Sequence, residues 1–403
     1  MTATAMPRAT PSSASRTAHV RERWHMSVEA RALVLVTSTL LAFGLAVLYS
    51  SSAIIAMQAN LPGYYYLTKQ LTGVLAGTVI FAVCAKVDAE RWAKWAWPLM
   101  WLCLTTMLVT VLPFTKSIAP SIHGSRRFIM GGSLQPSEIA KLGVICWTAM
   151  LVVKKGEGLR RLTKGLLPFL VVVGALDVMA ILEPDLSTAM LYTLLMGIVL
   201  FAGGVRIGHF VALGIIAIPL LYKQAERLQY VVLRLISFFE PTSAKAKEDI
   251  GYQLKQSLIA VGSGRFTGVG FGEGRQQYGF LPFAYSDFIG SNIGEEWGFL
   301  GLLFVIVAFA AYGYLGFRIA RNARTPFQRL FAVGLTCTTL MTAYLHIGVV
   351  IGLLPTTGLT LPFFSYGRSN LVLSLLMTGV LVNIGSVRER VVGERATNPL
   401  GGV

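Results

Sequence analysis

The sequence predicts an all-α membrane protein that crosses the bilayer about ten times. Three observations support this fold class. Apolar residues make up 54% of the 403 residues, and charged residues make up only 13%, about half the share in an ordinary soluble domain. The apolar residues form runs of the length that a membrane-spanning helix needs, about 20 residues. The charged residues lie in short clusters between these runs, which excludes a soluble globule and a disordered chain.

Ten apolar runs qualify as membrane-spanning helices. They cover residues 32–54, 66–86, 95–114, 138–153, 165–182, 186–203, 207–222, 297–317, 328–351 and 368–386. Residues 1–30 are rich in Ala, Ser, Thr and Arg without apolar periodicity, which predicts a flexible cytoplasmic tail. Residues 31–390 are expected to form one transmembrane domain, and residues 391–403 a second cytoplasmic tail.

The distribution of cations predicts that both termini face the cytoplasm. With the N-terminus inside, the cytoplasmic segments carry 21 of the 35 Lys and Arg residues, in agreement with the positive-inside rule. An even number of spans returns the C-terminus to the same side. This anchoring explains the net charge of +16. The cations do not form stripes interleaved with aromatic residues, so nucleic acid is not an expected partner.

Two of the predicted outer loops are long, residues 115–137 and residues 223–296, the second lying between spans seven and eight. A loop of that length is usually functional. The larger loop contains an apolar stripe at helical spacing, which predicts a helix lying in the outer membrane interface and ending at Pro241. The stripe consists of Leu228, Val231, Val232, Leu235, Ile236 and Phe239. A second short amphipathic helix is predicted over residues 252–261.

Charged side chains at membrane depth are costly, so each one is a candidate functional residue. Glu138 and Lys141 lie three residues apart at the start of the fourth span, where they either only neutralise each other or form the polar floor of a substrate cavity. Asp185 directly precedes the sixth span and suits a helix N-cap as well as a site residue. Asp177, inside the fifth span, is a weaker candidate that would pair with a cation on another helix.

The outer loops contain three further candidates. Arg126 and Arg127 bring two guanidinium groups to the membrane surface, where they bind either the phosphates of a substrate or lipid headgroups. Asp287 is a lone carboxylate among apolar residues beside a membrane helix. Burial there would raise its pKa and suit a general base, whereas the alternative is an ordinary helix cap.

The cysteines and histidines predict neither a disulfide framework nor a metal site. All four cysteines lie inside apolar runs, and the five histidines form no metal-binding pair. His346 lies in an apolar run, which favours a hydrogen-bonded packing role over a ligand role. The glycines between Gly262 and Gly274 lack the preceding strand and following helix of a dinucleotide site, so they are expected to form turns.

Several motifs in combination resemble the SEDS family of bacterial membrane glycosyltransferases, whose branches include the division protein FtsW and the elongation protein RodA. The similar segments are residues 124–129, 135–142, 183–189, 252–257, 287–296 and 354–367. The resemblance spans about residues 32–390. The sequence Leu-Thr-Leu-Pro, which contains Thr360, is similar to the corresponding sequence of the division branch.

The resemblance implies an enzyme that polymerises lipid II, a disaccharide-peptide joined by pyrophosphate to a polyprenyl chain, at the outer face of the cytoplasmic (inner) membrane. The family's essential aspartate corresponds to Asp287, and residues of its central cavity correspond to Glu138, Lys141 and Asp185. Ser365, in the last motif, is expected to bind substrate as well. The implied partners are a class B penicillin-binding protein and other membrane proteins of the division septum.

The leaving group explains why one carboxylate is sufficient for this reaction. Glycosidases use two carboxyl groups because a poor leaving group must be protonated, whereas pyrophosphate leaves as a stable anion. We therefore expect Asp287 to act as the base and Arg126, Arg127 and Lys141 to hold the pyrophosphate, with inversion at the anomeric carbon. A divalent cation such as Mg or Mn would share that task.

Two other functions are compatible with the sequence. A lipid II flippase would have a similar bundle with buried charges, but its polar residues would be spread through the whole bilayer depth. A catalytically silent scaffold for the transpeptidase is suggested by departures from the family pattern. These departures are at Phe283, Tyr285, Thr357, Arg368 and Asn370. The candidates cluster near the outer side and Asp287 is retained, so surface chemistry is favoured.

Overall fold

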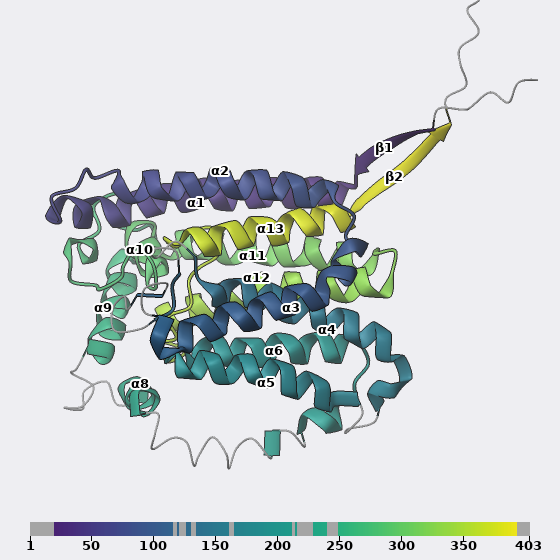
Figure 1. Cartoon of the computed structure of the whole chain (residues 1–403). Helices are drawn as coiled ribbons and strands as arrows, with labels where there is room; N and C mark the ends of the chain where they lie inside the picture. Colours follow the sequence, from purple (N-terminus) through teal and green to yellow (C-terminus); the bar gives the residue numbers. More distant parts are fainter. Residues whose placement is uncertain are drawn as a thin grey trace, which may run out of the picture.

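The computed structural model describes residues 20–115, 119–120, 126–129, 134–160, 165–211, 214–215, 229–239 and 249–392. It is a bundle of helices (Figure 1). Within the described residues, five helices are long and apolar enough to cross a membrane: α1 (Val28–Gln58), α2 (Tyr65–Lys86), α4 (Pro136–Lys155), α11 (Gly298–Arg321) and α12 (Pro326–Val350). The bundle also contains α3 (Glu90–Val111), α5 (Leu167–Leu182), α6 (Leu186–Ala202) and α13 (Arg368–Ile384). The predicted all-α membrane fold is thus confirmed.

Nine of the ten predicted spans coincide with these helices. The seventh, residues 207–222, lies mostly outside the described residues, so the count of ten crossings stays a prediction. Local sequence sets the helix starts. Pro136 occupies the first turn of α4, where its missing N–H costs nothing. Thr325 caps α12 by accepting a hydrogen bond from the Gln328 N–H at 3.2 Å.

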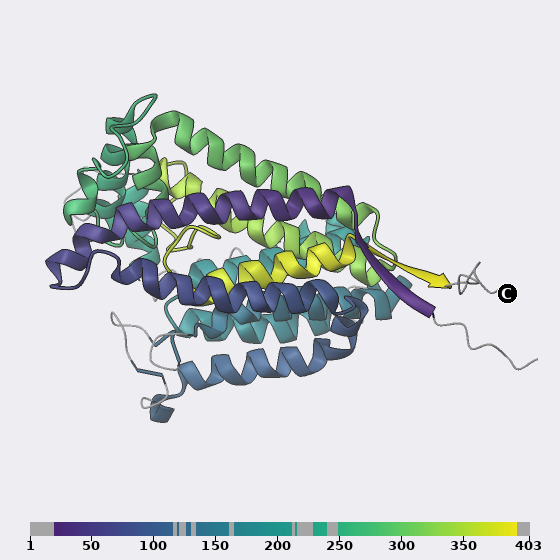
Figure 2. The same ribbon diagram turned by 90° about the horizontal axis from the view of Figure 1, so that it is seen from above.

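The helices differ in depth within the bundle. In Figures 1 and 2, α1 and α2 run together along one side, α13 lies against α2, and α5 and α6 form the opposite side. The most apolar stretch of α4 is 83% buried and that of α12 is 67% buried, compared with 33% for α1 and 22% for α2. α4 and α12 are therefore the central helices, and α1 and α2 expose most of their apolar surface to lipid.

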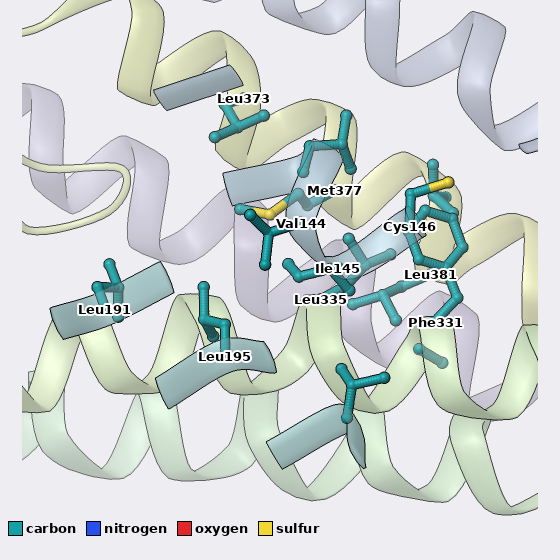
Figure 3. Packing of buried hydrophobic residues seen from close by; sticks show 14 of the residues in the cluster. Val144, Ile145, Cys146, Leu191, Leu195, Phe331, Leu335, Leu373, Met377 and Leu381 are labelled. Carbon is teal, nitrogen blue, oxygen red and sulfur yellow. The ribbon is translucent and has the colours of Figure 1, made fainter. Parts of the chain in front are cut away.

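The central core joins four helices that are far apart in the sequence. Figure 3 shows Val144 and Ile145 of α4 near Leu195 of α6, Leu335 of α12 and Met377 of α13. All five side chains are at most 5% exposed. This core fixes α4, α6, α12 and α13 relative to one another, and the candidate site residues lie at the ends of these helices.

Two glycines allow α2 and α13 to approach closely. A Cβ atom on Gly77 would lie 2.6 Å from Leu375 Cδ1, and one on Gly379 would lie 2.6 Å from the Phe81 carbonyl oxygen. Small residues at such crossings bring helix backbones together, which is a frequent basis of helix association in membranes. The α2–α13 contact holds the start of each helix at the same end of the bundle.

The larger outer loop contains helices of its own, all at one end of the bundle (Figure 1). α8 (Gln229–Phe239) and α9 (Asp249–Gly264) confirm the two predicted amphipathic helices, and the position of α8 in the membrane interface stays a prediction. A short helix, α10 (Ile289–Glu296), leads into α11. Single 3-10 turns occur at Pro113–Thr115, Gly156–Arg160 and Gln276–Tyr278.

The termini differ from the predicted tails. β1 (Val20–Met26) pairs antiparallel with β2 (Ser386–Val392), so part of residues 1–30 and the first residues after 390 form a small sheet. The register sets Glu22 opposite Arg390 and Arg23 opposite Glu389. The composition of each segment by itself does not predict this pairing, because the two strands lie at opposite ends of the sequence. Residues 1–19 and 393–403 lie outside the described residues.

Candidate active site at the outer end of the bundle

Asp287 lies in a tight turn just before α10. The Phe283 carbonyl oxygen accepts hydrogen bonds from the backbone N–H groups of Ser286, Asp287 and Phe288 at 3.0, 3.1 and 3.3 Å. Phe283 itself has a φ of 55°, a left-handed conformation that is strained for an aromatic residue. The buried Phe288 anchors the turn. The backbone at Asp287 is thus held in a defined turn, and the Asp287 side chain is half-buried.

A second loop, residues 354–367, lies against the Asp287 turn. Ser365 Oγ donates a hydrogen bond to the Ser286 carbonyl at 2.6 Å, and the Tyr366 N–H donates to the Tyr285 carbonyl at 2.9 Å. Gly358 has a φ of +72°, and a Cβ atom there would lie 3.7 Å from Asp287 Oδ2. Two motifs that are about 70 residues apart in the sequence therefore meet at the aspartate.

Gln70 fixes the second loop to the start of α2. Its side chain is fully buried, and its Nε2 donates to the Ser365 carbonyl at 3.1 Å while its Oε1 accepts from the Gly367 N–H at 3.2 Å. Both ends of the amide are satisfied, so the loop has a defined position. Gln70 was not among the residues predicted from the sequence, because a single glutamine near a helix start carries no signal by itself.

Ser365 was predicted to bind substrate. The structure places it beside the Asp287 turn, where its hydroxyl accepts from the Leu361 N–H at 2.8 Å and donates to the Ser286 carbonyl. Its side chain is buried. The hydroxyl proton is therefore engaged within the protein, and direct contact with substrate stays a prediction.

Burial raises the pKa of Asp287 to about 6, from a reference value of 3.8. The Ser286 hydroxyl and the positive charge of Arg127 act in the opposite direction and favour the ionised form, while the negative charge of Asp185 disfavours it. Loss of hydration thus dominates over the nearby charges. The carboxylate is ionised at neutral pH and is more basic than an exposed aspartate.

Arg127 and Asp185 are brought together at the turn between α5 and α6. Arg127 donates from Nε to the Glu183 carbonyl at 2.9 Å and from Nη2 to the Pro184 carbonyl at 2.7 Å, and its Nη1 lies 3.6 Å from Asp185 Oδ2. Asp185 also caps α6, as predicted, by accepting from the Thr188 N–H at 3.1 Å. Thr110 bonds the Glu183 carboxyl group, and burial raises the pKa of that group to about 7.

Arg126 is held within its own loop. Its guanidinium donates to the Leu112 carbonyl at 2.6 Å, to Thr115 Oγ1 at 3.0 Å and to the Ala119 carbonyl at 3.2 Å. These bonds make it a residue that shapes the loop before Arg127. Its contact with phosphate stays a prediction. Ser125 lies outside the described residues.

Glu138 and Lys141 form the predicted pair on one face of α4. Lys141 Nζ lies 2.7 Å from Glu138 Oε2, and the two side chains are only 4% and 10% exposed. The start of α4 is tied to the start of α13, because the Gln135 N–H donates to Ser369 Oγ at 3.1 Å. The pair therefore belongs to the same end of the bundle as the second loop.

The described residues do not gather a set of ligands for a resident metal ion. No three His, Cys, Asp or Glu side chains come together in the part of the chain that the structure describes. Asp185 already faces Arg127. A divalent cation would therefore have to take most of its ligands from the substrate.

The sequence matches the family model of the cell cycle proteins FtsW, RodA and SpoVE over residues 30–390. The chain belongs to this family. A relative, named as a probable peptidoglycan glycosyltransferase FtsW of Trichlorobacter lovleyi, is 36% identical over 356 residues, which is 88% of this chain and 92% of that protein. Stage V sporulation protein E of Bacillus subtilis is 33% identical over 357 residues, 87% of this chain and 95% of that protein.

The FtsW/RodA/SpoVE fold is also found among solved structures. A chain of a peptidoglycan synthase complex that coordinates polymerization and crosslinking aligns with a TM-score of 0.71 at 23% identity, over 88% of this chain and 96% of that chain. Thermus thermophilus rod shape determining protein RodA aligns with a TM-score of 0.62, also at 23% identity, over 88% of this chain and 95% of that chain. The protein is thus a multi-pass membrane protein with this family's fold.

Proposed function

We propose that this protein is a peptidoglycan glycosyltransferase that polymerises lipid II into glycan strands at the outer face of the cytoplasmic membrane during cell division. The names of its relatives support the reaction class. The structural observation that best supports the proposal is the environment of Asp287. Its carboxylate is half-buried, and burial raises its pKa to about 6. The residue lies in a defined turn, within electrostatic range of other charged groups.

Asp287 acts as the general base on the acceptor. It takes the proton from the sugar hydroxyl of the incoming lipid II as that oxygen forms a bond with the anomeric carbon of the donor, the growing chain on its lipid. The bond between this carbon and the pyrophosphate oxygen breaks, and polyprenyl pyrophosphate leaves with the electron pair. The displacement inverts the anomeric carbon. A base with a pKa below but near the working pH combines full ionisation with useful basicity.

Positive charge near the aspartate stabilises the leaving pyrophosphate. Arg127 lies within electrostatic range of Asp287, and its planar guanidinium suits phosphate oxygens. Asp185 orients Arg127 from the α6 cap. Lys141, paired with Glu138, adds a second cation at the same end of the bundle. Arg126 supports the pyrophosphate site from the loop before Arg127. A bound Mg or Mn ion would add positive charge at the leaving pyrophosphate.

The proposed partner is a class B penicillin-binding protein, which would crosslink the strands that this protein makes. The similarity in fold to a chain of a peptidoglycan synthase complex supports this assignment. The Leu-Thr-Leu-Pro sequence around Thr360 supports a role at the division septum, together with other division-site membrane proteins. Filamentous cells after depletion would support division, whereas spherical cells would indicate elongation.

The test is polymerisation in proteoliposomes that receive labelled lipid II only on the outside, with the partner transpeptidase present. The wild-type protein should make polymer there, and Asp287→Ala should abolish it, because a positioned base contributes roughly 10²- to 10⁴-fold in rate. Glu273→Ala is the matched control, since Glu273 is an exposed carboxylate of the same loop. Transfer of lipid II across the bilayer without polymer would indicate a flippase, and inactive wild-type protein would indicate a scaffold.

A further inference from the structure

His346 is the one histidine of the described residues that has both ring nitrogens hydrogen-bonded to backbone groups of other segments. It lies in the last turn of α12 and is 1% exposed. Its Nδ1 lies 2.8 Å from the Leu359 carbonyl oxygen, and its Nε2 lies 3.2 Å from the Gly290 nitrogen. A carbonyl only accepts and a backbone N–H only donates, so the ring is neutral with its proton on Nδ1.

The two bonds of His346 reach the two segments that flank Asp287. Gly290 lies in the first turn of α10, three residues after Asp287. Leu359 follows Gly358, whose position faces Asp287 Oδ2. The imidazole therefore connects the start of α10 to the second loop directly beside the aspartate. A Cβ atom on Gly290 would lie 3.2 Å from Nε2, so a side chain at this position would press against the imidazole.

The other side-chain hydrogen bonds described for this region do not join the start of α10 to the second loop. Ser365 and Tyr366 bond the residues before Asp287, at Ser286 and Tyr285. On the far side of α10, Ser257 lies 2.7 Å from Ser291 Oγ and donates to the Val350 carbonyl at 2.8 Å. Among the described residues, His346 alone joins the segment after Asp287 to the second loop by side-chain hydrogen bonds.

We infer that His346 is a positioning residue for the proposed reaction: its neutral imidazole holds the start of α10 against Leu359 and so keeps the Asp287 carboxylate aimed at the acceptor hydroxyl. This inference rests on the proposed function of Asp287. It assigns no proton transfer to His346, because both ring nitrogens are occupied within the protein.

Three substitutions separate the two bonds. His346→Leu removes both. His346→Asn retains a donor near the position of Nδ1 and so preserves the bond to Leu359, while His346→Gln reaches the position of Nε2 and preserves an acceptor for the Gly290 N–H. We expect His346→Leu to lower kcat by about 10- to 100-fold, since a misplacement of about 1 Å costs up to about 100-fold. The Asn and Gln variants should lie between it and the wild type.

The measurements are kcat and apparent KM for labelled lipid II, per molecule of folded protein recovered by size exclusion. The KM should change less than about twofold, because His346 touches no substrate. Thr338→Val on the same helix is the control: Thr338 is equally buried and bonds only the Gly334 carbonyl of its own helix. That variant should keep the wild-type kcat.

The outcomes distinguish this inference from the proposed function. If the wild type makes no polymer, the proposed function fails, and the inference fails with it. If the wild type is active and folded His346→Asn and His346→Gln both keep its kcat, only the inference is overturned, and His346 is a packing residue. A decrease in kcat that also occurs in Thr338→Val would overturn it as well. Should His346→Leu not fold, the Asn and Gln variants still decide.

Discussion

Asp287 is half-buried and is still ionised at neutral pH. Because burial raises its folded-state pKa to about 6, the base is active only above that value. We expect kcat/KM for polymerisation to fall as the pH drops through about 6 and to level off above about 7. Burial also raises the pKa of Glu296 to about 7, so Glu296→Gln serves as the control. A midpoint that moved in Glu296→Gln would contradict the assignment to Asp287.

The same raised pKa implies that Asp287 destabilises the folded protein. A carboxyl group whose pKa is higher in the folded state contributes stability below its unfolded value, near 4, and loses it as the pH rises through about 6. Asp287→Asn should therefore be inactive and yet more stable at pH 7.5, by about 1 to 3 kcal/mol at about 1.4 kcal/mol per pKa unit. Thermal unfolding should show this gain shrinking towards pH 4. An equal gain at both pH values would argue against it.

At the level of helices and loops, the sequence predicted the helix positions, because these depend on local patterns of apolar residues. The apolar runs located nine helices, and the stripe from Leu228 to Phe239 located α8. Proximity between distant segments was not predictable in this way. Gln70 holding the second loop and His346 joining it to α10 depend on contacts across more than 50 residues, for which a single sequence carries no periodicity. The motif resemblance implied the importance of Asp287 without revealing which groups orient it.

The sequence allowed two interpretations of the Glu138–Lys141 pair of α4: two residues that only neutralise each other, or the polar floor of a substrate cavity. Substitutions distinguish these interpretations. If the pair is fully dehydrated, as its low exposure indicates, Glu138→Leu alone leaves an uncompensated buried ammonium and should cost about 3 to 5 kcal/mol. Adding Lys141→Met should recover most of that loss. Unfolding in detergent measures both variants. A cost of about 1 kcal/mol or less for Glu138→Leu would instead indicate a hydrated cavity floor.

At the scale of the whole molecule, one end of the bundle contains both the chemistry and the loops. α8, α9, α10 and the second loop gather at that end (Figure 1), and the sheet of β1 and β2 lies at the other. The last turn of α11 carries Arg318 and Arg321, and the turn that leads to α12 carries Arg324, a cluster that the positive-inside rule assigns to the cytoplasm. The proposed reaction therefore requires the Asp287 end to face outwards.

This orientation can be tested with single cysteines and a membrane-impermeant maleimide on intact cells. Thr267→Cys, on an exposed part of the outer loop, should be labelled directly. Asn322→Cys, at the exposed turn after α11, should be labelled only after permeabilisation. The wild-type protein is the blank, because Cys84, Cys103 and Cys146 are buried and Cys337 is half-buried within a helix. The reverse pattern would put Asp287 on the cytoplasmic side, away from the site of glycan assembly, and would contradict the proposed function.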